Sequence, residues 1–162
     1  MNAPTLSIRR EAGATHLETE QTLPRPLSEV FPFFADAFNL EKLTPPFLSF
    51  SIIGTEPIEM RVGALIDYRL RLHGLPFRWR TAITAWEPPY RFVDEQLRGP
   101  YRLWRHEHRF TAKDGETVVS DHVTYKVPGG ALIDRLFVER DVVKIFGYRF
   151  EALERWVTSG TL

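Results

Sequence analysis

The chain has 162 residues, and its 21 lysines and arginines balance 21 aspartates and glutamates. A chain without net charge lacks the positive field that attracts nucleic acid or anionic membranes, so neither is an expected partner. It has no cysteine, which excludes disulfides, thiolate nucleophiles and thiolate metal sites. It also has no secretory leader and no apolar run of about 18 residues. We therefore expect a soluble, cytoplasmic protein without membrane insertion.

The N-terminal third predicts one strand and two short helices. Residues 1–14 are polar and lack periodicity, and we expect a disordered arm there, before a single domain over 15–160. Alternation of side-chain polarity predicts a strand over 15–23, because side chains of a strand alternate between two faces. Short helices are expected at about 28–34 and 36–43, between prolines that limit their length.

The middle of the chain predicts six consecutive strands. Short turns rich in glycine and proline separate them, and such turns join antiparallel neighbours. We therefore expect an antiparallel meander in one sheet. The expected strands are 47–53, 64–72, 76–87, 91–98, 102–112 and 116–127.

The last thirty residues change to a helical period and predict one helix of about 28 residues, roughly 40 Å long. The apolar residues that recur every three or four positions are Leu132, Leu136, Val143, Phe146, Gly147, Phe150, Leu153 and Val157. The opposite side, expected to face solvent, holds Asp134, Arg135, Glu139, Arg149, Glu151 and Arg155. Packing of the apolar stripe on the inner face of a curved sheet would leave space between helix and sheet.

The most informative segment is the strand over 104–110. Its alternation sends one set of side chains, Trp104, His106, His108 and Phe110, to the same face. The other face receives the charged set Arg105, Glu107 and Arg109. Two imidazoles are therefore expected on an interior wall that also carries large aromatic rings.

The Asp114-Gly115 pair predicts a type I′ turn and thereby a hairpin register. In this register Phe110 faces Val119, His108 faces Asp121, His106 faces Val123 and Trp104 faces Tyr125. A slip of one residue would exchange the two faces, so the pattern supports the register. His106 then has no hairpin partner of its own, so if any residue of this strand reaches a ligand unaided, we expect it to be His106.

Three interpretations of the histidines remain open. His108 and Asp121 could be only a satisfied interior pair. Asp121 could instead fix the tautomer of His108 and raise its basicity, which leaves the other ring nitrogen to bind or deprotonate a ligand. His106, His108 and Asp121 could also form a facial metal site. The inner face offers no further histidine or cysteine, so we expect neither a metal nor another cofactor.

The order strand, two short helices, six-stranded meander and long C-terminal helix resembles the helix-grip or START-like superfamily, known as SRPBCC, over residues 15–157. Its members include pollen-allergen-like and polyketide cyclase/dehydrase proteins. A bacterial branch of mostly uncharacterised ligand-binding members is similar in Phe92, Asp94, Gln96, Gly99, Pro100, Tyr101, Trp104, His106, His108, Phe110, Asp121, Val123, Tyr125, Ile145, Phe146, Tyr148 and Arg149. The resemblance implies an α+β helix-grip fold, with a curved antiparallel sheet of about seven strands around the C-terminal helix.

The resemblance also implies an internal cavity for a small apolar or aromatic molecule, such as a lipid or polyketide. The family motif, rather than the periodicity, places Gln96 on the inner face. The candidate ligand-binding residues are Tyr68, Trp79, Gln96, Trp104, His106, His108, Asp121, Tyr125, Phe146 and Phe150.

A binding or carrier module, monomeric or homodimeric, is the first functional hypothesis. The alternative is a cyclase/dehydrase-type enzyme, in which His108 and Asp121 are the catalytic base and Tyr68 or Tyr125 is the acid. A third hypothesis is an interaction protein of the toxin–antitoxin or cell-division type, which would lack a ligand and expose an apolar patch instead.

Overall fold

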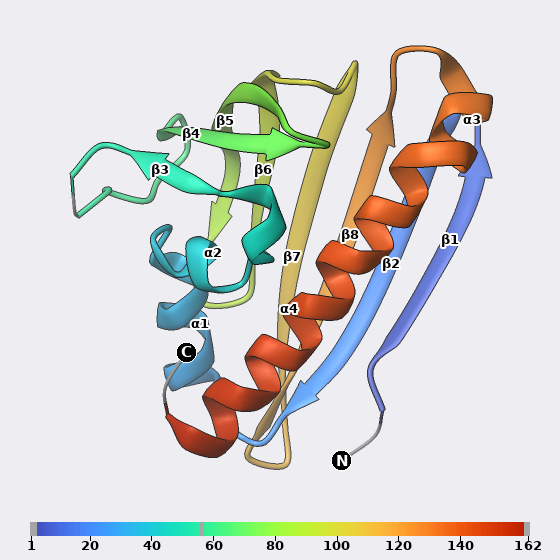
Figure 1. The fold of residues 1–162 in the computed structure, drawn as a ribbon. Coiled ribbons are helices and arrows are strands. Elements are labelled where there is room, and N and C mark those ends of the chain that lie inside the picture. Colours follow the sequence, from blue (N-terminus) through green and yellow to red (C-terminus); the bar gives the residue numbers. More distant parts are fainter. Residues whose placement is uncertain (1–2, 56, 161–162) are drawn as a thin grey trace.

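Eight antiparallel strands form one curved sheet in the order β1-β2-β8-β7-β6-β5-β4-β3. The computed structural model describes residues 3–55 and 57–160. The strands are β1 (Thr5–Glu11), β2 (Ala14–Leu23), β3 (Ser51–Ile53), β4 (Leu65–Leu72), β5 (Leu75–Glu87), β6 (Arg91–Arg98), β7 (Leu103–Lys113) and β8 (Glu116–Lys126). The predicted α+β fold, a meander around a long C-terminal helix, is thereby confirmed (Figure 1).

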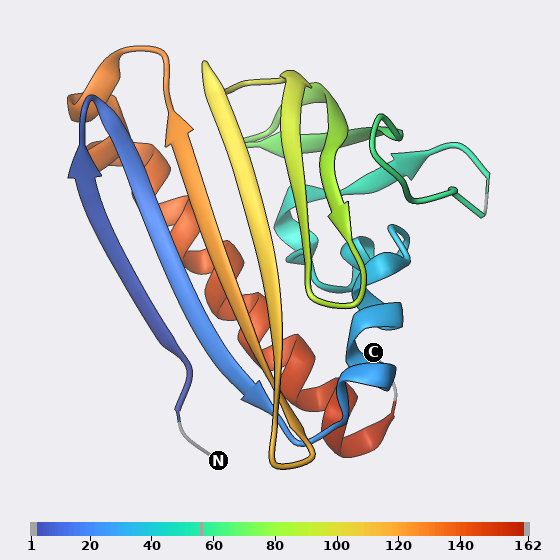
Figure 2. The same ribbon diagram turned by 180° about the vertical axis from the view of Figure 1, so that it is seen from behind.

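The long helix crosses the concave face of the sheet, and the short helices close one end of the space between them (Figures 1 and 2). The helical elements are α1 (Leu27–Ala35), α2 (Asn39–Lys42), η1 (Pro46–Leu48), α3 (Gly130–Ile133), η2 (Asp134–Val138) and α4 (Glu139–Ser159). Here η1 is a 3₁₀ turn and η2 is a π-helical turn. None of these helices is both long and apolar enough to cross a bilayer.

The N-terminal segment is a strand where we expected a disordered arm. β1 pairs with β2 from Thr5 opposite Glu20 to Glu11 opposite Ala14, and this adds an eighth strand to the sheet. Its alternation is weak in sequence because Leu6 and Ile8 are the only large apolar residues that β1 packs against the core. The next residue on this inward face, Arg10, is charged. The sequence of the segment by itself therefore indicates a polar tail.

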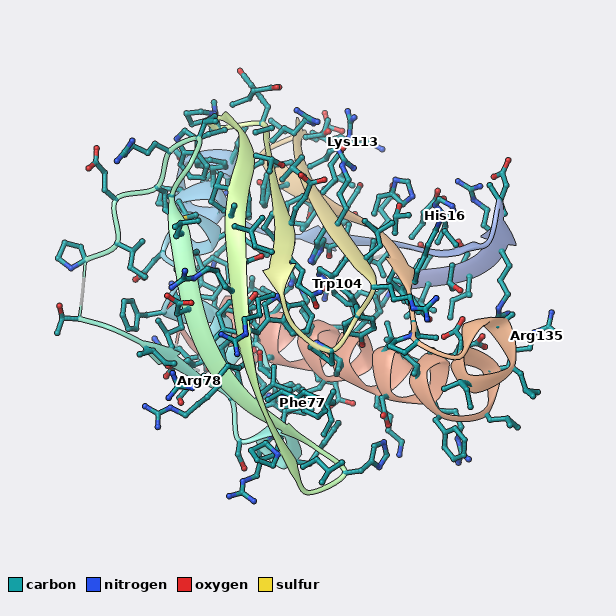
Figure 3. All side chains as sticks on the ribbon, turned by 90° about the horizontal axis from the view of Figure 1, so that it is seen from above. His16, Phe77, Arg78, Trp104, Lys113 and Arg135 are labelled. Atoms are coloured by element: carbon teal, nitrogen blue, oxygen red, sulfur yellow. The ribbon has the colours of Figure 1, made fainter. Side chains whose placement is uncertain are left out.

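The hairpin of β7 and β8 has the predicted register. Asp114 and Gly115 both have positive φ angles, 53° and 83°, as a type I′ turn requires. His108 lies opposite Asp121, His106 opposite Val123, and Trp104 opposite Tyr125. Figure 3 shows Trp104 between the sheet and α4.

The C-terminal helix differs from the prediction in which side chains it buries. Leu132 and Leu136, expected in the apolar stripe, are 68% and 52% exposed. Asp134 and Arg149, expected on the solvent side, are instead buried. For Leu132, Asp134 and Leu136 the reason is η2, because a π-helical turn shifts the phase of the residues at and before it relative to those of α4. Arg149 lies within α4, on the same face as Phe146. The face that α4 buries consists of Val142, Phe146, Arg149, Ala152 and Leu153.

Asp134 ties the start of the helical segment to the sheet. Its carboxylate accepts hydrogen bonds from the Tyr125 hydroxyl at 2.9 Å and from the Thr15 hydroxyl at 2.5 Å. Arg10 of β1 completes the cluster by pairing with both Asp134 and Glu139. A buried carboxylate is tolerated when several donors replace its hydration, and here they come from three strands. The contact also explains the inward-facing charge of β1.

Replacement of Asp134 by alanine should lower the free energy of unfolding by about 3 kcal/mol, because it leaves the Tyr125 and Thr15 hydroxyls and Arg10 without their shared acceptor. Urea denaturation followed by circular dichroism measures the change. The matched control is Arg135→Ala, next to it in the chain and exposed, which should change the value by less than about 0.5 kcal/mol. Similar effects of the two substitutions would contradict this role of Asp134.

Candidate functional site

A cavity of about 170 Å³ lies between the sheet, the short helices and α4. Side chains of α1, α2, β4, β5, β6, β7 and α4 line it, and most of them are apolar. An apolar cavity of about 150 Å³ is enough to admit benzene, so this space suits a compact ring. The predicted ligand-binding residues that line it are Tyr68, Trp79, Trp104, His106, His108 and Phe146.

Four of the predicted ligand-binding residues do not line the cavity: Gln96, Asp121, Tyr125 and Phe150. The side-chain amide of Gln96 donates to the Tyr101 carbonyl at 2.7 Å and accepts from the Tyr101 amide at 3.2 Å, so it braces the turn between β6 and β7. Tyr125 donates to Asp134, and the carbonyl of Phe150 accepts from Gln21. The motif positions of Gln96 and Tyr125 thus have structural partners.

Two histidines and two aspartates form the polar cluster beside the cavity. Each histidine forms its shortest hydrogen bond with the aspartate that is not directly opposite it on the neighbouring strand. The register places His106 opposite Asp94, yet its Nε2 lies 2.8 Å from Oδ1 of Asp121. His108 lies opposite Asp121, yet its Nε2 lies 2.8 Å from Oδ2 of Asp94. Its Nδ1 is 3.1 Å from Asp121 Oδ1. The expectation that His106 lacks a partner is therefore wrong, and Asp121 serves both imidazoles.

Arg149 is the residue of this cluster that the sequence analysis misplaced. Its Nη2 donates to Asp121 Oδ1 at 3.3 Å, and its side chain is 6% exposed. The guanidinium lies 5.2 Å from the ring centre of Phe34 and 5.8 Å from that of Phe146, a cation–π arrangement on both sides. Its position seven residues after Val142 and three after Phe146 places it on their face of α4, and this spacing is the signal that could have identified it.

The surroundings of the histidine pair favour the proton on His108 over His106. Its Nε2 lies 2.8 Å from Asp94 Oδ2 and its Nδ1 lies 3.1 Å from Asp121 Oδ1, a position in which an imidazolium pairs with both carboxylates, while Nη2 of Arg149 is 3.4 Å from the same Nδ1. Burial alone would lower the pKa of His108, but its hydrogen bonds to Asp121 and Asp94 outweigh burial and raise the pKa above its usual value. The same interactions, with the charge of Arg149, keep the pKa of Asp121 well below its usual range despite burial.

His106 is neutral at physiological pH. Burial and the adjacent charge of His108 lower its pKa to about 4, although Asp121 opposes the shift. The two imidazole rings stack with centres 3.7 Å apart, so protonation of both would place two cations face to face. Because Nε2 of His106 donates to Asp121, its Nδ1 carries a lone pair, and no described residue bonds to that atom.

The cluster also offers three metal-ligand atoms, from Asp94, His106 and His108, within 4.8 Å of one another. A divalent cation there would displace the proton of His108 and would lie in a cluster that already contains the Arg149 guanidinium. Loss of that proton and the repulsion between the metal ion and the guanidinium are both unfavourable, and the carboxylates already have cationic partners. The arrangement therefore suits an ion-pair cluster better than a metal centre.

A family model described as "Polyketide cyclase / dehydrase and lipid transport" matches residues 23–153. This range contains the cavity-lining residues of β4 to β7 and of α4. None of the curated proteins matches the chain significantly.

Solved structures share the fold across nearly the whole chain. Protein Ms6760 from Mycobacterium smegmatis has a TM-score of 0.70 at 16% identity, covering 96% of this chain and 99% of that one. The ZhuI aromatase/cyclase from Streptomyces sp. R1128 has a TM-score of 0.65 at 18% identity, covering 92% and 99%. Ara h 8.0201 has a TM-score of 0.65 at 21% identity, covering 90% and 99%. At these identities the likeness is one of fold.

The lowered pKa of His106 makes stability depend on pH between 6.5 and about 4. In this window the unfolded chain binds a proton at His106 that the folded chain does not, so the free energy of unfolding falls as pH falls. His108 adds little slope there, because its raised pKa favours the protonated form in the folded chain and the unfolded chain also gains that proton as pH falls below 6.5. His106→Gln should therefore lose less stability than wild type between pH 6.5 and 4.5.

Urea denaturation at a series of pH values measures this difference. The control is His73→Gln, which removes a histidine whose side chain is 68% exposed and pairs with Asp141 outside the cluster. Parallel pH profiles for wild type and His106→Gln would contradict a neutral, buried His106. Below about pH 4 the carboxyls of Asp94 and Asp121 begin to titrate, and their lowered pKa values make both proteins lose stability there.

Proposed function

Because the chain belongs to the polyketide cyclase/dehydrase and lipid transport family, we propose that it binds a small apolar or aromatic molecule in the cavity between the sheet and α4. The observation that carries the proposal is the composition of the cavity wall: an apolar lining with one polar cluster, of Asp94, His106, His108 and Arg149. A mostly apolar pocket with few convergent polar groups is the usual form of a small-molecule site.

Two unpaired donors in the wall indicate what the ligand carries. Nε1 of Trp79 and Nε of Arg149 are buried and have no hydrogen-bond partner among the described residues. Leaving a buried donor unsatisfied costs about 1 to 3 kcal/mol, which an acceptor on the ligand would recover. Both residues line the cavity, although neighbouring atoms cover these two nitrogens, so a ligand reaches them only when a lining side chain moves. The donors favour a ligand with hydroxyl or carbonyl oxygens over a pure hydrocarbon.

A cyclase/dehydrase-type activity is the second candidate, and the geometry favours His106 over His108 as its base. Nε2 of His108 is bonded to Asp94, and its Nδ1 lies against both Asp121 and Arg149, so neither nitrogen is free to accept a proton from a ligand. His106 has a free Nδ1, and Asp121 on its Nε2 would stabilise the imidazolium formed when Nδ1 takes a proton from a ligand carbon. With a pKa of about 4 in the free protein, His106 is a weak base. Binding is therefore the first function that we propose.

The binding function predicts that 4-ethylphenol and ethylbenzene, two single-ring probes, bind saturably with one molecule per chain in isothermal titration calorimetry. Leu70→Trp, at a buried residue of the cavity wall, should fill the space and weaken binding at least tenfold. The matched control Leu97→Trp adds the same side chain at a residue that is 60% exposed and does not line the cavity. Absence of saturable binding, or equal affinity in Leu70→Trp and wild type, would contradict the proposal.

The catalytic candidate predicts that the protein accelerates the exchange of the acetyl methyl protons of 4-ethylacetophenone, which lie next to the carbonyl, with deuterium from the solvent. NMR measures this exchange rate. His106→Gln should abolish the acceleration while the ketone still binds, because glutamine keeps a donor for Asp121 but has no base. His73→Gln, at an exposed histidine, is the control and should exchange like wild type. An unaccelerated wild-type rate would exclude this base chemistry for the probe and leave binding alone.

A further inference from the structure

We propose that the cavity selects neutral ligands and rejects both carboxylates and ammonium ions, because the charges of three side chains at its polar wall and of Asp121 directly behind them cancel. The inference rests on the proposed function, since it concerns which small molecules the same cavity takes. It adds a constraint on ligand charge that apolarity of the lining alone does not give.

The charges form a closed set of two anions and two cations. The carboxylates belong to Asp94 and Asp121, and the cations are the imidazolium of His108 and the guanidinium of Arg149. Each cation contacts a carboxylate: His108 lies 2.8 Å from Asp94 and 3.1 Å from Asp121, and Arg149 lies 3.3 Å from Asp121. The side chains of these four residues are at most 16% exposed, so water screens them little.

The rest of the lining holds no charge that could pair with an ionic ligand inside the cavity. His106 is neutral, and the described lining has no lysine. Asp36 also lines the cavity, but it is exposed and its Oδ1 accepts from the Phe38 amide at 3.0 Å, which places it at the rim. Its negative charge would repel an entering anion.

An ionic ligand would therefore be buried without a free counterion. A carboxylate could take the unpaired Nε proton of Arg149, but the positive charge of this guanidinium is already balanced by Asp121, so the buried ligand would leave one negative charge uncompensated. An ammonium ion faces the converse problem, because both carboxylates already have cationic partners. Burying an unpaired charge costs far more free energy than burying a neutral polar group.

A neutral oxygen group meets the free atoms of the same wall. The unpaired donors on Trp79 and Arg149 suit a hydroxyl or carbonyl oxygen, and the free Nδ1 of His106 suits a hydroxyl proton. The ligand class is therefore a compact, neutral ring compound with hydroxyl or carbonyl groups. Free carboxylic acids, phosphate esters and amines are outside it.

Three probes that share one hydrocarbon part and differ in charge test the inference: 4-ethylphenol, 4-ethylbenzoate and 4-ethylbenzylammonium. Isothermal titration calorimetry at pH 7 should show that 4-ethylphenol binds at least tenfold more tightly than either ion. An ion that binds as tightly as the phenol, or more tightly, would overturn the selection for neutral ligands while leaving the proposed binding function intact. Failure of all three probes, and of ethylbenzene, would instead overturn the proposed function.

A variant that unbalances the charge set tests its cause. Arg149→Gln keeps a donor for Asp121 but leaves the wall with one net negative charge, so the affinity ratio of 4-ethylbenzylammonium to 4-ethylbenzoate should rise at least tenfold. Arg135→Gln makes the same charge change at an exposed position of η2, outside the cavity lining, and should keep the wild-type ratio. Equal ratios in the two variants would overturn the role of the charge set. Should Arg149→Gln fail to fold by circular dichroism, the wild-type probe series decides the inference by itself.

Discussion

The Asp121 carboxylate is the group on which the arrangement of the interior depends. It accepts from His106, His108 and Arg149 on one oxygen and from the Thr19 hydroxyl, at 3.1 Å, on the other. These donors come from β7, α4 and β2, so one side chain of β8 connects the sheet to the long helix. A buried carboxylate without such donors would be strongly destabilising, and the elements must therefore dock where all of them can reach it.

The same carboxylate gives the two histidines different chemical properties. Shared between His108 and Arg149, it helps to hold His108 as a cation, and the charge of His108 in turn lowers the pKa of the stacked His106 to about 4. Phe92 stacks on the other face of His108, with ring centres 4.1 Å apart, and separates the charged ring from the apolar core beyond. One imidazole is therefore a structural cation and the other is a neutral group at the cavity wall.

The fold and part of the candidate site could be predicted because their signals are local. The Asp114-Gly115 turn and the alternation along β7 and β8 determine which residues face each other and which face inward, since a strand has a period of two and a type I′ turn admits few sequences. The predicted positions of Trp104, His106 and His108 on the cavity wall follow from that local pattern. The element order, with its resemblance to a known superfamily, supplied the helix on the concave face.

The remaining features depend on residues far apart in the chain. The register alone pairs His108 with Asp121, but in three dimensions the ring nitrogens also reach diagonally, so that His106 bonds to Asp121 and His108 to Asp94. A charged residue in a helical pattern normally indicates a solvent-facing position, whereas Arg149 is buried against Asp121 of β8.

The sequence by itself therefore determined seven of the eight strands, the hairpin register and the aromatic wall with its two imidazoles, since each depends on neighbours in the chain and on backbone geometry. Only the tertiary structure decided that β1 joins the sheet, that Asp134 and Arg149 are buried and that the charges around Asp121 balance. The physical reason is that the cost of burying a charge depends on which distant partners surround it, and no local pattern records those partners.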